Sequence, residues 1–291
     1  MNPIIHFNKA LEYIESHLNE TLDLKQITQI AHCSEYHFQR MFSYLSGQSL
    51  HQYISARRLS MAALDCVQTH ERILEIALKY GYQSHDVFTR AFKDFHGITP
   101  SALRKSKAAF ISTPRLIFQL TLKGATTMNV RIIDKQSFHI IGFKRNVPIQ
   151  FEGINPEITK IWQNLNPTNI PILKGLCDQE PKGIISASFN FSEDRMQEKG
   201  TLDHMIGVIT YQSHPDFDLL EVPAYTWAVF DIIGPFPEFL QKTWGQIYSE
   251  WFPSVPYESV NGPEIVWNEH PDTTDPRYHS QIWIPIRKKK D

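Results

Sequence analysis

A repeat with a period of 50 residues constrains the first part of this 291-residue chain more than any other feature. A shift of 50 positions superimposes Ser34, Phe38, Arg40, Phe42 and Gly47 on Ser84, Phe88, Arg90, Phe92 and Gly97. In each copy a serine precedes an apolar stripe with helical spacing and a glycine follows it, and these are the start and stop signals of a helix. A short helix before each copy would make two helix-turn-helix units.

Apolar residues at intervals of three and four predict helices throughout the first hundred residues. Asp23 is the expected N-cap of the helix before the first copy, and a long helix over about residues 50–69 joins the two units. The alternative is a plain helical bundle of two αα-hairpins.

The second helix of each unit turns polar side chains outward when its phenylalanines face inward. These residues are Tyr36, Gln39, Arg40 and Ser43 in the first copy, and Asp86, Thr89, Arg90 and Lys93 in the second. Hydrogen-bonding side chains with an arginine suit base edges and phosphates in the major groove of DNA. Asp86 either accepts a hydrogen bond from a cytosine or, as we prefer, pairs with Arg90 four residues on.

Residues 1–107 and 128–291 differ in pattern and in composition. The later part contains all six tryptophans and β-rich runs, interrupted by helical stretches at about 156–164 and 237–251, which indicates an α+β domain. We expect residues 108–127 to be a linker that contributes an edge strand. Residues 1–110 carry 12 basic and 10 acidic side chains, whereas residues 111–291 carry 17 and 21, so the net charge changes from +2 to −4 and the two parts suggest two functions.

The segments SEYHFQRMFSYLSGQSLHQYISARRL and GYQSHDVFTRAFKDFHGITPSALR closely resemble the DNA-binding domain of AraC/XylS-family transcription regulators. The resemblance implies an all-α, homeodomain-like double helix-turn-helix domain that binds double-stranded DNA, with RNA polymerase as a partner. It places Tyr36, Gln39 and Arg40 of the first helix, and His85, Asp86 and Arg90 of the second, at DNA-contacting positions.

The later part resembles the GyrI-like effector-binding domain, through NVRIIDKQSFHIIGFK, AYTWAVFDIIGPFPEFLQKTWGQIYSEWFP and HPDTTDPRYHSQIWIPIRK. The resemblance implies a duplicated β-α-β-β arrangement with an apolar groove for a small-molecule effector. Related multidrug-binding proteins have a glutamate in the final strand where this chain has Gln281. Cationic ligands are therefore disfavoured unless Glu221, Glu264 or Glu269 supplies the charge.

Alternation along the strands suggests which side chains line the groove. Gln281 and Trp283 share one face of the last strand, while Ile185, Ala187, Phe189 and Phe191 share one face of an earlier strand. The candidate ligand-binding residues are Trp162, Phe189, Phe191, Trp227, Trp267, Gln281 and Trp283. Each aromatic taken alone is better explained as core, but as a set they suit a small apolar or aromatic ligand.

We find no catalytic motif, metal-binding pattern or cofactor fingerprint, so we expect no enzyme activity, no metal and no cofactor. Three scattered cysteines, no apolar run that could span a bilayer and no secretory signal favour the cytoplasm. The sequence therefore predicts a bacterial DNA-binding transcription regulator modulated by a small molecule. The alternative is a GyrI-like binding or hydrolytic protein whose helical half binds a partner.

Overall fold

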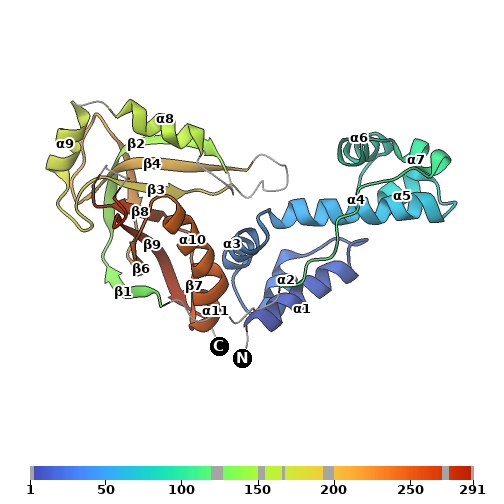
Figure 1. The fold of residues 1–291 in the computed structure, drawn as a ribbon, viewed down its shortest axis with the longest axis horizontal. Helices are drawn as coiled ribbons and strands as arrows, with labels where there is room; N and C mark the ends of the chain where they lie inside the picture. The colour runs from blue at the N-terminus through green and yellow to red at the C-terminus, as the bar shows by residue number, and fades with distance from the viewer. Residues whose placement is uncertain are drawn as a thin grey trace. The chain divides into compact units, whose positions relative to one another are not determined.

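The computed structural model describes residues 3–118, 127–149, 155–165, 168–192, 200–270 and 275–289. The chain packs as two compact units. The first contains residues 1–38 and 48–121, and the second contains residues 39–47 and 122–291. Figure 1 labels most of the helices and strands of both.

Helices make up the described part of residues 3–106, as the apolar spacing predicts. They are α1 (Pro3–Ser16), α2 (Leu24–Ala31), α3 (Glu35–Ser46), α4 (Leu50–Gln68), α5 (Ile73–Lys79), α6 (His85–His96) and α7 (Pro100–Ser106). The pairs α2–α3 and α5–α6 are the two helix-turn-helix units, with α4 between them. The repeated phenylalanines of α3 and α6 are completely buried.

Local hydrogen bonds explain where these helices begin and end. The Asp23 carboxylate accepts from the Lys25 amide before α2, and the Ser84 hydroxyl accepts from the Val87 amide before α6. Gly47 and Gly97 follow α3 and α6 with φ of +70° and +74°, a conformation that favours glycine. The predicted caps and stops are therefore confirmed.

Residues 107–118 form no strand, so the expected edge strand is wrong for this part of the segment; residues 119–126 lie outside the described chain. Residues 113–118 instead lie along the first unit. The Thr113 amide donates to the Ser60 hydroxyl at 2.9 Å, and the Thr113 carbonyl accepts from Arg57 at 2.6 Å. Further on, Asn8 exchanges two hydrogen bonds with the backbone of Phe118.

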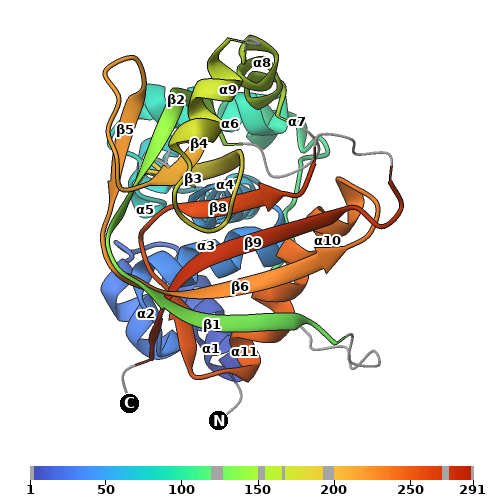
Figure 2. The same ribbon diagram turned by 90° about the vertical axis from the view of Figure 1, so that its left-hand side faces the viewer.

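Among the residues that the structure describes, the second unit is built on a nine-stranded antiparallel sheet. Its strands are β1 (Asn129–Lys135), β2 (Phe138–Pro148), β3 (Ile185–Phe189), β4 (Thr201–Thr210), β5 (Asp218–Val222), β6 (Tyr225–Ile233), β7 (Tyr257–Ser259), β8 (Glu264–Asn268) and β9 (His279–Lys288). Eight follow the order β1-β6-β9-β8-β3-β4-β2-β5 (Figure 2). Strand β7 pairs with β9 off this path.

This strand order contains an internal duplication. Strands β2, β4 and β3 form one half and β6, β9 and β8 the other, and the halves meet where β3 pairs with β8. The strand preceding each half crosses to the opposite half, since β1 pairs with β6 and β5 pairs with β2. The duplicated arrangement that the family resemblance implied is confirmed.

Helices cover one face of the sheet. They are α8 (Pro156–Asn164), α9 (Asn169–Leu176), α10 (Glu238–Gln246), the π-helical turn η1 (Ile247–Trp251) and α11 (Phe252–Ser254). Ile161 of α8 packs with Ile206 of β4, and Trp251 of η1 packs edge-on against Phe230 of β6 at 4.9 Å. We call this the helix-covered face. The opposite face carries the tryptophan-rich core, and we call it the aromatic face.

Candidate nucleic-acid and ligand sites

The second recognition helix, α6, presents a polar surface. Ser84 caps its N-terminus, Phe88 and Phe92 anchor it, and His85, Asp86 and Arg90 are exposed while Thr89 is half-buried. Asp86 lies 3.4 Å from the His85 imidazole. The preferred Asp86–Arg90 pair is therefore wrong, because Asp86 turns toward its sequence neighbour.

The first recognition helix, α3, differs from α6 in exposure. Tyr36 and Gln39 are half-buried, while Arg40 and Ser43 are 6% and 3% exposed. The Ser43 hydroxyl donates to the Gln39 carbonyl within the helix. Four side chains proposed for DNA are thus accessible or partly accessible on α6, but two of the four on α3 are buried.

The neighbouring arginines of α4, Arg57 and Arg58, both form hydrogen bonds within the helical unit. Arg57 forms a bidentate pair with Glu15 of α1, and Arg58 donates to the carbonyls of Leu18 and Glu20. Burial alone would raise the pKa of the Glu15 carboxyl, but hydrogen bonds from Arg57 and Tyr53 hold that pKa below its ordinary value. These guanidinium groups join α1 to α4.

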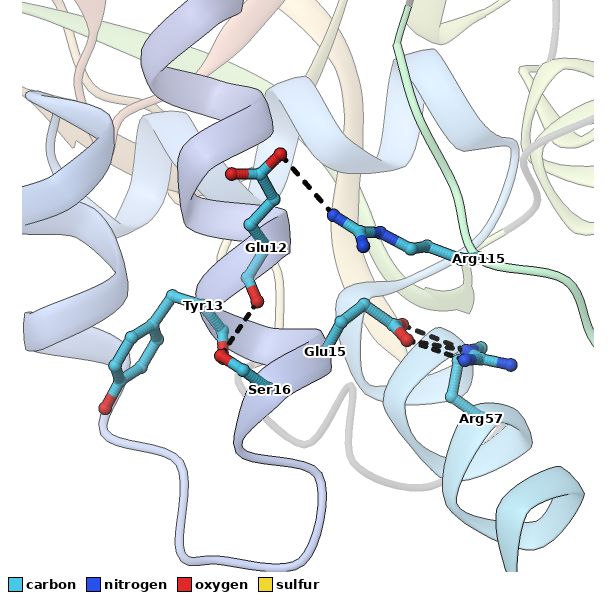
Figure 3. A pocket seen from close by; sticks show the side chains of 6 residues that line it. All are labelled: Glu12, Tyr13, Glu15, Ser16, Arg57 and Arg115. Atoms are coloured by element: carbon cyan, nitrogen blue, oxygen red, sulfur yellow. Dashed lines mark hydrogen bonds and ion pairs between the residues drawn. The ribbon is translucent and has the colours of Figure 1, made fainter.

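A hollow of about 630 Å³ lies beside this pair (Figure 3). Its wall consists of Glu12, Tyr13, Glu15, Ser16, Arg57 and Arg115. The charged groups largely satisfy one another, since Glu15 pairs with Arg57 and Arg115 lies 3.5 Å from Glu12. None of the ligand-binding candidates from the sequence lines this hollow.

The aromatic face brings together four of the proposed ligand-binding residues. Phe189, Trp227 and Trp283 are buried in one cluster, with Trp267 packed against it. The Trp227 indole N–H has no hydrogen-bond partner among the described residues. The Lys135 ammonium lies 5.6 Å from the Trp283 ring. A positively charged side chain of the protein therefore already contacts an aromatic ring on this face.

Gln281 is tied into the aromatic face by two hydrogen bonds. Its amide donates to Asp231 of β6 at 2.7 Å, and its carbonyl oxygen accepts from the Trp283 indole at 2.9 Å. Gln281 and Trp283 therefore share a face, as the alternation predicts. Asp231 also accepts from Arg131, so its charge is compensated.

Two of the proposed ligand-binding residues lie elsewhere. Trp162 is 39% exposed on α8. Phe191 belongs to the helix-covered face, where it packs with Ile206, because β3 ends at Phe189 and Asn190 adopts a left-handed conformation with φ of +49°. The expectation that Phe191 continues the face of Phe189 is therefore wrong.

The helix-covered face contains a buried carboxylate near the junction of the two halves. Glu264 of β8 is 5% exposed and accepts a hydrogen bond from the Tyr248 hydroxyl of η1 at 3.2 Å. Within the same unit it forms a bidentate ion pair with Arg40. Of the three glutamates considered from the sequence, Glu264 is buried, whereas Glu221 and Glu269 are exposed.

His204 of β4 is a second buried titratable group in this unit. Burial lowers the pKa of its imidazole to about 4, so the ring is neutral at pH 7. The ring nitrogen Nδ1 lies 3.0 Å from the Ser188 hydroxyl, and Nε2 has no partner among the described residues.

In the part of the chain that the structure describes, no cluster of three metal-binding side chains occurs and no helix could cross a membrane.

The model of the GyrI-like small molecule binding domain matches residues 128–287, more than half of the chain, and a helix-turn-helix domain matches residues 27–106. The chain belongs to the AraC-type helix-turn-helix family and carries a GyrI-like domain. The structure and the two matches thus agree on two domain types.

Three curated relatives illustrate this membership. The Transposon Tn10 TetD protein of Escherichia coli is 42% identical over 98 residues, which cover 34% of this chain and 71% of the relative. The multiple antibiotic resistance protein MarA of Salmonella typhimurium is 34% identical over 34% of this chain and 79% of its own length. The right origin-binding protein of Escherichia coli is 33% identical over 59% of this chain and 61% of its own length, so the match spans less than two thirds of that relative.

The sequence analysis named Glu264 only as one alternative and missed Tyr248, which donates a hydrogen bond to it, and Trp244, which stacks near Tyr248. A glutamate at the start of a strand is ordinary in sequence terms. Its partners are Tyr248 of η1, 16 positions away, and Arg40 of α3, 224 positions away, so no local signal identifies it.

Proposed function

We propose that this protein is a transcription regulator that binds double-stranded DNA through α3 and α6 and responds to a small molecule bound by its GyrI-like domain. It acts where the bacterial chromosome and RNA polymerase are found, in the cytoplasm, and it regulates by binding rather than by catalysis. DNA binding is supported above all by α6, a capped helix that buries two phenylalanines and exposes His85, Asp86 and Arg90.

The names of the relatives are consistent with this proposal. One is described as an origin-binding protein and another as a transcriptional regulator. The family match on residues 128–287 supports the small-molecule part. On the aromatic face, the buried Trp227 donor without a partner suits a neutral ligand that accepts a hydrogen bond.

Selection of DNA tests the proposal directly. The purified full-length protein is mixed with a pool of random duplexes, and the retained fragments are sequenced to define a site. We expect Arg90→Ala to weaken binding to that site by about 1–3 kcal/mol and to relax specificity at a few base pairs. Arg90 is exposed, so its replacement leaves the fold intact.

Lys9→Ala is the matched control, because Lys9 is an exposed cation of α1 outside both recognition helices. It should leave the affinity nearly unchanged. If no sequence is enriched, or if Arg90→Ala binds the selected site as tightly as the wild type, then α6 is not a recognition helix. The alternative, a small-molecule-binding or hydrolytic protein, would then be preferred.

A further inference from the structure

We propose that Val87 of the second recognition helix determines part of the DNA specificity, by contacting the 5-methyl group of a thymine beside the base pair that Arg90 reads. The inference rests on the proposed function, since it requires α6 to enter the major groove. It assigns a base and a residue that the polar side chains of α6 do not account for.

Val87 is the one large apolar side chain that is exposed among the described residues of α6. It is 57% exposed, whereas Phe88 and Phe92 are completely buried and form the core contact of the helix. The Ser84 hydroxyl accepts from the Val87 amide, so Val87 belongs to the first turn of α6. A single exposed apolar residue is ordinary on a protein surface, so its role depends on the groups around it.

The groups around Val87 form the exposed face of the helix. With 3.6 residues per turn, Arg90 lies about 180° from the midpoint of the buried Phe88 and Phe92. Asp86 and Val87 lie about 40° and 60° from Arg90, one on each side of it. The three side chains therefore share the outward face in the N-terminal half of α6, the part of a recognition helix that contacts base edges.

The carboxylate of Asp86 indicates that this face meets bases rather than phosphates. The Asp86 side chain is 95% exposed and lies 3.4 Å from the His85 imidazole. Because backbone phosphates repel an exposed carboxylate, this turn of α6 can approach DNA closely only at base edges that present donors, in the major groove. Val87 is then carried to the base edges together with Arg90.

The chemistry of valine selects the base. The 5-methyl group of thymine is the apolar group that base pairs present in the major groove, and contact with Val87 would remove both from water. The edges of the other bases present donors or acceptors, which valine would leave without a partner. Valine has one strongly preferred rotamer in a helix, so the contact costs little side-chain entropy. We therefore expect a T·A pair beside the base pair read by Arg90.

Replacement of thymine by deoxyuridine tests this contact. The base pairs read by Arg90 are those at which Arg90→Ala relaxes the selected site. Neighbouring thymines are then replaced one at a time by deoxyuridine, which lacks only the 5-methyl group. We expect the full-length wild type to bind about fourfold more weakly after one of these replacements, the value of one methyl group returned to water.

Val87→Ala completes a double-mutant cycle with the methyl group. The variant should bind the thymine site about fourfold more weakly than the wild type, and the change to deoxyuridine should not weaken it further. Val87 is exposed and alanine favours a helix, so the variant should keep the fold, which thermal unfolding verifies.

Leu78→Ala is the matched control, because Leu78 is an equally exposed apolar residue of α5, outside both recognition helices. It should respond to deoxyuridine as the wild type does.

A methylated cytosine separates the methyl group from the rest of the base. When a C·G pair replaces the T·A pair at this position, the wild type should bind more weakly. A 5-methyl group on that cytosine should restore about fourfold in affinity to the wild type but none to Val87→Ala.

The outcomes distinguish the role of Val87 from the proposed function. If Arg90→Ala relaxes the site, but the wild type and Val87→Ala respond equally to the loss of each neighbouring methyl group, then Val87 does not read thymine and the proposed function stands. A selected site without thymine beside the Arg90 base pair leads to the same conclusion. If no sequence is selected, or if Arg90→Ala binds it as tightly as the wild type, the proposed function fails and the role of Val87 fails with it.

Discussion

Arg40 and His204 are two buried basic side chains whose surroundings have opposite effects on their charge. Arg40 lies against the Glu264 carboxylate and aromatic rings, so its positive charge is compensated. His204 has a hydroxyl beside Nδ1 but no carboxylate, and burial lowers its pKa to about 4. At the scale of single residues, a buried basic side chain therefore keeps its charge beside a carboxylate partner, whereas His204, which lacks one, is neutral at pH 7.

The neutral state of His204 predicts a pH dependence of stability. In the unfolded chain the pKa of this imidazole is near 6.5, so it binds a proton below that pH. In the folded state the imidazole stays neutral until the pH falls to about 4. The stability that depends on a neutral His204 is fully present above pH 6.5, and it is lost as the pH falls toward 4. Between pH 7 and 4.5 this single group should reduce the free energy of unfolding by about 2–3 kcal/mol.

Urea denaturation of the wild type and of His204→Asn at the two pH values isolates this effect. Asparagine can keep a hydrogen bond to Ser188 and does not titrate. The variant should therefore lose less free energy of unfolding on acidification than the wild type does. Identical losses in the two proteins would show that the folded state protonates His204 as readily as the unfolded chain does.

At the scale of elements, backbone geometry decides which side chains can work together. The left-handed residue Asn190 ends β3 and sends Phe191 to the helix-covered face, away from Phe189. Gly142 of β2 and Gly207 of β4 lie directly opposite each other in the sheet. A Cβ atom added to either would lie 2.0 Å from a backbone carbonyl oxygen of the other strand.

Gly142→Ala should therefore destabilise the protein severely, by about 3 kcal/mol or more, because the neighbouring atom is backbone and cannot rotate away. Thermal or urea unfolding measures the loss. Gly245→Ala is the control, since a Cβ atom there meets nothing within 4 Å and alanine favours the helix α10. A Gly142→Ala protein as stable as the wild type would show that β2 and β4 are farther apart than described.

At the scale of the whole molecule, the helical domain extends past its last helix. Backbone groups of Thr113, Leu116 and Phe118 hydrogen-bond to side chains of α1 and α4. The domain boundaries expected from the sequence, at residues 107 and 128, remain predictions. The contacts of residues 113–118 indicate where a fragment should end.

We expect a fragment of residues 1–118 to be more stable than one of residues 1–110 by about 2–4 kcal/mol, since each lost hydrogen bond contributes about 1 kcal/mol. Both should fold and bind the selected DNA, and residues 128–291 should fold on their own. Urea denaturation followed by circular dichroism makes the comparison. Equal midpoints for the two N-terminal fragments would show that residues 113–118 do not stabilise the helical domain, and a 1–118 fragment that stays unfolded would contradict separability.

The sequence by itself determined the helices, their caps and the two repeated units, because a cap such as Ser84 and a stop such as Gly97 act on amides a few residues away. Alternation likewise placed Gln281 beside Trp283. Only the tertiary structure decided the exchange of β1 and β5 between the halves, the face on which Phe191 lies, and the partner of Arg40. Arg40 and Glu264 are 224 positions apart, and their pairing follows from burial that many distant elements create together, so no local pattern predicts it.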